Sequence, residues 1–218
     1  MTQHTITIDL YADIACPWCY LGEARLQRAL AARPDLKVTE TWRPFQLQPQ
    51  LPPAGLPWRG FAEKKFGGWE RARGMFGQLI SLGHAEGLAF DFEDIAKANN
   101  TADAHRLILL AENEGQGLAA ADALFKAYFE NGEDLNSEAA LLAVAERVGL
   151  EPTKVQRYRE SDVGRAEVAA SQQRAAQLGI SGVPFYVFND AYGVSGAQPV
   201  EVFLEVFEQL ANQKEANV

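Results

Sequence analysis

The feature that most constrains this chain is a pair of cysteines, Cys16 and Cys19, the only two in its 218 residues. They follow residues 5–11, an alternating run rich in β-branched side chains that predicts a strand. From Pro17 the pattern turns helical, and proline is tolerated at a first helical position because its missing N–H would have no intrahelical partner. The pair therefore lies at a strand-to-helix junction, which indicates redox chemistry more strongly than the C-x-x-C spacing alone.

This junction has consequences for Cys16. A sulfur at the N-cap can accept hydrogen bonds from the N–H groups of Trp18 and Cys19, and it lies at the positive end of the helix dipole. Both effects favour the thiolate. Residues three apart on a helix have Cα atoms about 5 Å apart, within the roughly 4.4–6.8 Å that a disulfide spans. We therefore expect Cys16 to be the exposed, attacking sulfur and Cys19 to be the more buried sulfur that resolves the mixed disulfide.

The two cysteines have two other interpretations, a structural zinc site and a pair of inert buried thiols. Structural zinc takes four ligands, and only His4, His84 and His105 could join the cysteines, none at a ligand spacing. Two inert buried cysteines would be the other case. The helix-start position disfavours it, because that environment activates thiols. We therefore expect no metal.

Charge and hydropathy narrow the classes of partner. The formal net charge of −9 and the pI of about 4.9 argue against nucleic acid and anionic membranes as partners. No apolar run approaches the ~18 residues of a membrane span. The first residues have no basic segment followed by an apolar core, so we expect no secretory signal and a cytoplasmic location. There a lone C-x-x-C is more often catalytic than structural. The oligomeric state is unconstrained, with a monomer slightly favoured.

The order of predicted elements indicates an interrupted α/β fold. Residues 36–43 alternate as a second strand, which gives a βαβ unit with a parallel pair. A proline-rich loop follows at 48–57. Near the end of the chain, residues 185–188 and 191–196 predict a hairpin, the first strand being of the fully buried type, and residues 199–212 predict a closing helix.

Between these parts the periodicity is helical, with almost no strand signal. The predicted helices are 58–66, 69–86, 102–116, 118–130, 137–148, 152–160 and 161–178. We therefore divide the chain into the first half of an α/β domain (1–57), an all-helical insertion (58–178) and the second half of the α/β domain (179–218).

Pro184 directly precedes the first strand of the hairpin. On local sequence alone it is an ordinary trans proline at a strand start, since only about 5–6% of X–Pro bonds are cis.

Taken together, these motifs resemble a known family. The C-x-x-C at a first helix, with Gly182-Val183-Pro184 opening a late hairpin, resembles the thioredoxin fold, and the long helical insertion resembles the DsbA family. Four segments are similar to its cytoplasmic FrnE-like branch, up to about residue 210 of the chain: CPWCYLG at 16–22, RPFQL at 43–47, NTADAHRL at 100–107 and VSGAQ at 194–198.

The resemblance implies roles for further residues. Pro184 matches the family's cis-proline beside the redox pair, and a cis bond would turn the backbone of Val183 toward an extended substrate segment. The insertion would pack over the redox pair, with His105 facing it as a cation that favours the thiolate. A surface or merely structural role for His105 stays open.

Residues close to the cysteines were also considered. Asp13 is a candidate proton relay for Cys19, or a simply solvated carboxylate at a strand end. Pro17 and Trp18 are candidate substrate contacts, although Trp18 could equally just shield the pair.

The leading functional hypothesis is a thiol–disulfide oxidoreductase acting on protein or small-thiol disulfides through Cys16 and Cys19. The first alternative is a glutathione-dependent isomerase or transferase of the kappa type, although that class typically has serine in place of Cys16. The second is a non-catalytic, chaperone-like protein that binds through the proline-rich loop and exposed Trp58 and Trp69. No cofactor is expected, with glutathione as a possible redox partner.

Overall fold

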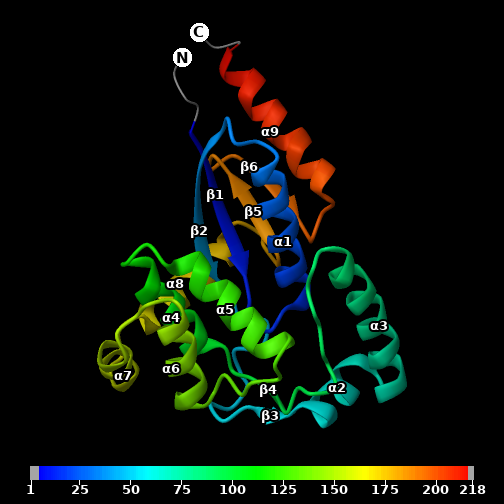
Figure 1. Ribbon diagram of the computed structural model, residues 1–218, viewed down its shortest axis with the longest axis vertical. Helices are drawn as coiled ribbons and strands as arrows, with labels where there is room; N and C mark the ends of the chain where they lie inside the picture. The colour runs from blue at the N-terminus through cyan, green and yellow to red at the C-terminus, as the bar shows by residue number, and fades with distance from the viewer. Residues whose placement is uncertain (1–4, 216–218) are drawn as a thin grey trace.

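The computed structural model describes residues 5–215, with side chains up to residue 212. His4 and the outermost ends of the predicted domains, residues 1–4 and 216–218, lie outside this range. The centre of the fold is a four-stranded sheet in the order β2 (Lys37–Pro44), β1 (Thr5–Ala12), β5 (Phe185–Phe188) and β6 (Tyr192–Ser195). Strand β1 pairs parallel with β2 and antiparallel with β5, as Figure 1 shows at the centre of the molecule.

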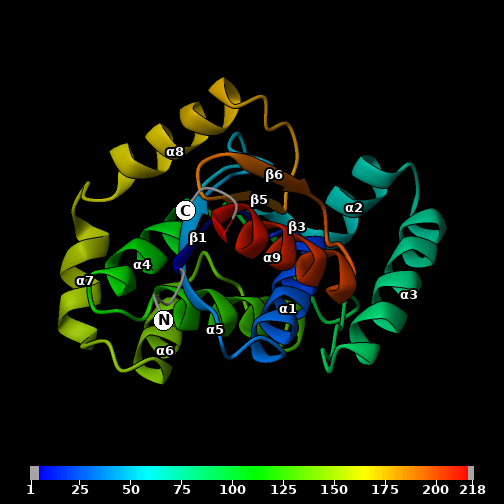
Figure 2. The same cartoon turned by 90° about the horizontal axis from the view of Figure 1, so that it is seen from above.

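Two helices cover one face of this sheet. Helix α1 (Pro17–Ala31) follows β1 directly and packs against α9 (Val200–Glu215), and Figure 2 shows the two side by side. Alternate residues of β1 are buried toward them, as period-2 patterning requires. This part of the core contains Ile6, Ile8, Leu10, Tyr186, Phe188, Phe203 and Phe207.

The opposite face of the sheet is covered by α8 (Arg165–Gln177). Its Ala175 joins a small core with Tyr11 and Phe45, against which Phe185 and Val187 also pack. Strand β5 therefore contacts a core on each face of the sheet, as expected for its apolar run, although Phe185 and Val187 are only partly buried. Although we predicted α8 as part of the insertion, it packs on the central sheet. Figure 2 shows it crossing the sheet opposite α9.

The hairpin between β5 and β6 turns at Asn189 and Asp190. Both have positive φ, 50° and 55°. Positive φ at both central residues is typical of the tight hairpin turn whose twist matches that of the strands. Asn and Asp are the non-glycine residues that adopt this conformation most readily.

The insertion lies at the end of the sheet where β1 meets α1 (Figure 1). Two of its helices have the predicted bounds, α2 (Trp58–Phe66) and α7 (Pro152–Glu160). The others are α3 (Trp69–Ala85), α4 (Ala102–Glu112), α5 (Gly117–Phe129) and α6 (Glu138–Arg147). A short antiparallel pair that the sequence did not predict, β3 (Leu56–Pro57) and β4 (Lys97–Ala98), ties the proline-rich loop to the segment before α4.

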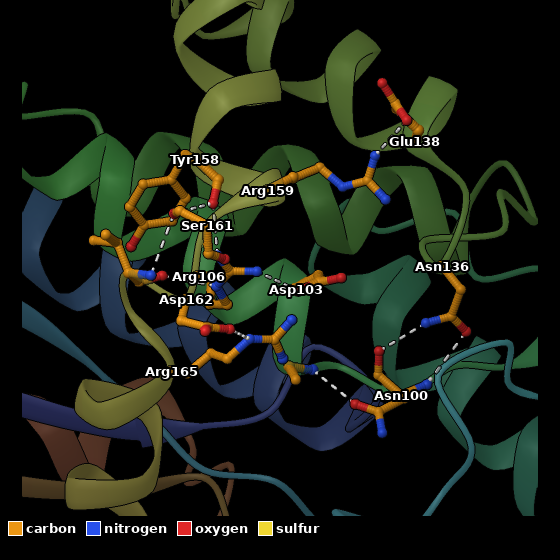
Figure 3. A network of polar contacts seen from close by, with 12 residues as sticks. Asn100, Asp103, Arg106, Asn136, Glu138, Tyr158, Arg159, Ser161, Asp162 and Arg165 are labelled. Atoms are coloured by element: carbon orange, nitrogen blue, oxygen red, sulfur yellow. Dashed lines mark hydrogen bonds and ion pairs between the residues drawn. The ribbon is translucent and has the colours of Figure 1, made fainter.

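A buried arginine joins the helices of the insertion. Arg106 of α4 is almost wholly buried. Its guanidinium donates to the carbonyl oxygens of Val163 (2.8 Å), Tyr158 (2.6 Å) and Ser161 (2.6 Å) and pairs with Asp103 at 2.8 Å. Figure 3 shows this network between α4 and the segment joining α7 to α8. Because these carbonyls bind Arg106, the chain from 161 to 164 is not helical, and the predicted helix 161–178 begins only at Arg165.

These elements make the molecule an α/β protein with a thioredoxin fold, interrupted by a large helical insertion. Within residues 5–215, no helix combines the length and the apolar character needed to cross a bilayer.

One pair of acidic side chains beside the sheet has an expected effect on stability. Gln27 of α1 donates to Glu23 Oε1 (2.7 Å) and to Glu40 Oε2 (2.8 Å), and one oxygen of each carboxylate is shut off from solvent. Burial raises the pKa of both glutamates, well above the usual range for Glu40, where the neighbouring Glu23 carboxylate adds to the shift. A raised folded-state pKa contributes stability below about pH 4.3, and this is lost as the pH rises through the folded value.

Glu40→Gln removes the ionisable group that causes this loss of stability as the pH rises. The new carboxamide still has an oxygen that can accept the N–H donated by Gln27. We expect the variant to gain about 1 kcal/mol of unfolding free energy at pH 8 and little at pH 4. Urea unfolding of both proteins at the two pH values measures the difference. An equal change at both values, or a loss at pH 8, would contradict this account of the pair.

Candidate redox site

Cys16 is the N-cap residue of α1, as predicted, but its surroundings differ from the expectation. Its backbone is extended (φ −103°, ψ 107°), and the side chain makes no capping hydrogen bond. Instead, Cys16 Sγ donates to the carbonyl oxygen of Val183 at 3.5 Å. Only 4% of the residue is exposed, so the predicted exposed position was wrong. The chain before β5 and the insertion cover the start of α1, which a local sequence pattern could not indicate.

Cys19 lies one turn into α1 and is completely buried. Its N–H donates to the carbonyl oxygen of Cys16 at 2.9 Å. Burial raises the pKa of the Cys19 thiol well above its usual range, and the neighbouring Cys16 sulfur raises it further. Cys19 is therefore a protonated thiol at neutral pH, and both cysteines are free.

The peptide bond between Val183 and Pro184 is cis, and the Pro184 carbonyl accepts the N–H of Gly196 at 2.8 Å. This loop lies close to α1 because Gly22 has no side chain. A Cβ added at Gly22 would come within 2.4 Å of Tyr186 Oη and 3.1 Å of Pro184 Cγ. The glycine that ends the C-P-W-C-Y-L-G motif is thus required for α1 to approach the proline loop.

Asp13 and His105 lie behind the cysteines. The Asp13 carboxylate is buried and accepts the N–H groups of Leu47 (2.7 Å) and Ala15 (3.2 Å). His105 Nε2 lies 3.3 Å from Asp13 Oδ1, without the alignment of a hydrogen bond. Trp42 Nε1 donates to His105 Nδ1 at 3.2 Å. The two ring nitrogens of His105 thus face different partners, Nδ1 the indole of Trp42 and Nε2 the carboxylate of Asp13.

These contacts change the predicted role of His105. The residue is completely buried between α4 and the α/β domain, where it contacts Trp42 and Asp13. It is absent from the walls of the cavity at Cys16. The structure therefore does not bring it to a substrate, and the carboxylate that its Nε2 faces is that of Asp13. Asp13 is not simply solvated either, because both of its oxygens bind backbone N–H groups.

A cavity of about 310 Å³ opens beside Cys16. Of the candidate residues named from the sequence, the structure brings Asp13, Cys16, Pro17, Trp18 and Val183 to its wall, and Trp18 is 38% exposed. Much of the remaining lining is apolar and comes from the insertion and from the loop that leads into it: Leu47, Leu51, Trp58, Phe61, Phe66, Met75, Phe76, Leu79, Phe92 and Phe129. Sequence analysis missed this group, since its members are dispersed over 80 residues and look like ordinary core positions.

Asn99 is another wall residue that sequence analysis missed. It is 2% exposed, and neither polar atom of its carboxamide has a hydrogen-bond partner within residues 5–215. Its neighbour Asn100 has a structural role instead, accepting the N–H of Ala102 at the start of α4 (3.0 Å) and the N–H that Gln46 Nε2 donates (3.3 Å). The sequence signal was the polar run 99–101 directly before α4.

Two predicted contact residues of the chaperone-like alternative are not exposed. Trp58 is buried, and its indole N–H donates to the carbonyl oxygen of Phe92 at 2.9 Å. Trp69 is half-buried and packs edge-on against Phe76. The predicted exposure of Trp58 was therefore wrong, because α2 and α3 turn these rings inward.

The sheet order, the cysteine-bearing first helix and the helical insertion together define a thioredoxin-fold protein. Comparison with known families then identifies the family within this fold. The chain belongs to the family of the DSBA-like thioredoxin domain, whose model matches residues 7–208.

Three relatives illustrate the similarity. A probable DsbA oxidoreductase from Streptomyces coelicolor is 36% identical, with a TM-score of 0.85 over 94% of this chain and 89% of its own. The uncharacterized protein YwbO of Bacillus subtilis is 24% identical over 207 residues, 91% of this chain and 94% of that protein. The cytosolic disulfide reductase DsbM from Pseudomonas aeruginosa, solved with GSH, shares the fold at 20% identity, with a TM-score of 0.67 over 94% of this chain and 99% of its own.

Proposed function

We propose that this protein is a thiol–disulfide oxidoreductase that acts through Cys16 and Cys19. The observation that carries the proposal is the position of the Cys16 sulfur. It lies at the start of α1, on the wall of a cavity, 3.5 Å from the Val183 carbonyl oxygen and one turn before a buried thiol. Membership of the DSBA-like family supports the same conclusion.

In the reducing direction, the Cys16 thiolate attacks one sulfur of a substrate disulfide. The substrate S–S bond breaks, one substrate thiolate leaves, and a mixed disulfide forms on Cys16. The Cys19 thiol then loses its proton and attacks Cys16 Sγ. The second substrate thiolate leaves, so the substrate gains two electrons and the protein keeps a Cys16–Cys19 disulfide.

In the oxidising direction the steps run in reverse. A substrate thiolate attacks the disulfide at Cys16, and Cys19 is the leaving thiol. The high pKa of Cys19 favours its uptake of a proton once it has left. The balance between the two directions depends on the redox potential of the pair relative to that of the compartment.

The residues around Cys16 have separate roles in this proposal. The backbone of Val183 pairs with an extended substrate segment, a contact that its position beside Cys16 supports. Pro17 and Trp18 supply the adjoining contact surface. Glutathione is a candidate redox partner. The assignments of this protein to the FrnE-like branch and to the cytoplasm remain predictions.

The redox equilibrium of the cysteine pair against mixtures of glutathione and its disulfide tests the proposal. Acid quenching, alkylation and mass spectrometry would measure the fraction of Cys16–Cys19 disulfide. We expect a single two-electron transition and catalysis of insulin reduction by a low-molecular-weight thiol. If no disulfide forms at any ratio and insulin is not reduced, the proposal is wrong.

A further inference from the structure

The cavity beside Cys16 has a chemical character that narrows the class of substrate. Seven aromatic rings and several aliphatic side chains of the insertion line it, and the lysine at its wall, Lys65, is itself exposed. Its volume of about 310 Å³ is at the lower end of the range for small-molecule sites, roughly 300–1,000 Å³. Since an apolar cavity of about 150 Å³ holds benzene, this one has room for a phenyl group and a short linker.

Access to the sulfur favours a small substrate. Cys16 is 4% exposed, so a disulfide held rigidly on a folded protein surface would have difficulty reaching it. A small molecule can approach through the cavity, whose wall includes both Cys16 and Val183.

Asn99 supplies the second observation. A buried carboxamide without hydrogen bonds costs free energy, and such groups are rare in folded proteins. The side chain of Asn99 lacks a partner within residues 5–215 although it borders the cavity. Two other polar wall residues are already bound: Asp13 accepts two backbone N–H groups, and Tyr128 donates to the carbonyl oxygen of Lys97 at 3.0 Å. An occupant with an amide or hydroxyl group would satisfy Asn99.

We propose that the cavity binds low-molecular-weight organic disulfides that carry an apolar, ring-sized group and one neutral amide or hydroxyl group, the latter bonded by Asn99. The inference rests on the proposed function, because Cys16 is the sulfur that attacks the bound disulfide. The step is the one described above: two substrate thiols are released and the Cys16–Cys19 disulfide forms. The reduced protein supplies both electrons, so a single turnover needs no other reductant.

Two matched probes separate apolar binding from intrinsic reactivity. Dibenzoylcystamine and diacetylcystamine have the same disulfide and amide groups and differ in the phenyl ring. Each is mixed with reduced protein, and the rate of Cys16–Cys19 disulfide formation is followed by acid quenching and mass spectrometry. We expect the benzoyl compound to react about tenfold faster or more, because its ring is transferred from water to the cavity.

Two variants on one helix provide the control. Met75 and Ile80 are both on α3 and similarly exposed, 42% and 43%, but only Met75 is among the residues that line the cavity. Met75→Glu is expected to reduce the benzoyl-to-acetyl rate ratio severalfold, whereas Ile80→Glu leaves it unchanged. An equal effect of both variants would overturn the proposal.

Asn99→Leu tests the polar contact with a readout besides activity. Removing an unpaired buried amide is expected to raise the unfolding midpoint in urea and to lower the rate with dibenzoylcystamine. A lower midpoint with an unchanged rate would mean that Asn99 is structural and would overturn its assignment.

The outcomes also distinguish a failure of the proposed oxidoreductase function from a failure of the cavity proposal alone. If neither probe nor glutathione disulfide oxidises the cysteine pair, the proposed function fails. If all three oxidise it and the benzoyl-to-acetyl ratio is near one, only the cavity proposal fails. If Met75→Glu slows insulin reduction as much as it slows reaction with the benzoyl probe, the cavity receives a protein side chain, and the small-molecule assignment is wrong.

Discussion

Cys16→Ser is expected to lower the rate of insulin reduction at least about a thousandfold, because the hydroxyl of serine cannot replace the attacking thiolate. Cys19→Ser is expected to behave differently. Cys16 still attacks, but no second sulfur resolves the product, so the mixed disulfide accumulates with a stoichiometry of one per protein. Mass spectrometry of each reduced variant, mixed with glutathione disulfide and quenched in acid, measures both effects.

The two serine variants are each other's control, since they change the same atom one helical turn apart. An adduct on Cys16→Ser and none on Cys19→Ser would reverse the assigned roles. The full burial of Cys19 and the cavity position of Cys16 make that outcome inconsistent with the structure. Equal adducts on both variants would mean that neither cysteine is specifically the attacking one.

Arg106→Met is expected to lower the free energy of unfolding by about 3–5 kcal/mol, the usual cost of removing one partner from a buried charged network. The substitution leaves the carbonyl oxygens of Tyr158, Ser161 and Val163 without the guanidinium that binds them. Unpaired buried carbonyls cost about 1–3 kcal/mol each before relaxation. Urea unfolding followed by circular dichroism measures the loss, and we expect the transition to move to a markedly lower urea concentration.

Arg165→Gln provides a matched control in the same region. Its guanidinium pairs with the exposed Asp162 at 3.0 Å, and Figure 3 shows both residues beside Arg106. Because surface pairs are worth about 0–1 kcal/mol, this variant should be close to the parent protein. If both arginine variants lose the same free energy of unfolding, the contacts of Arg106 with the backbone carbonyls do not stabilise the segment 161–164.

Local patterns predicted the framework of the fold. The alternation in residues 5–11 and the apolar run at 185–188 gave the two central strands, and the helices at 58–66 and 152–160 have the predicted bounds. Pro17 and Pro152 mark helix starts, and Asn189-Asp190 marks a turn, through backbone preferences that act within a few residues. Such preferences do not depend on where the rest of the chain lies.

Errors arose where a distant part of the chain supplied the deciding contact. Residues 161–164 have helical periodicity, but their backbone binds Arg106, more than 50 positions earlier. Helix α8 was assigned to the insertion, but its Ala175 packs on the sheet against Tyr11 and Phe45. His105 was expected at the redox pair, but Trp42 and Asp13 hold it one layer behind.

By itself, the sequence determined the position of the cysteine pair at the start of the first helix, the parallel βαβ unit and the late hairpin, because each follows from local backbone preferences and from the order of adjacent elements. Only the tertiary structure decided that Cys16 is buried against Val183, 167 positions away, and that dispersed aromatic residues and Asn99 enclose a cavity beside it. The physical reason is that burial and cavities depend on how separate helices pack, and many arrangements are compatible with the same local pattern.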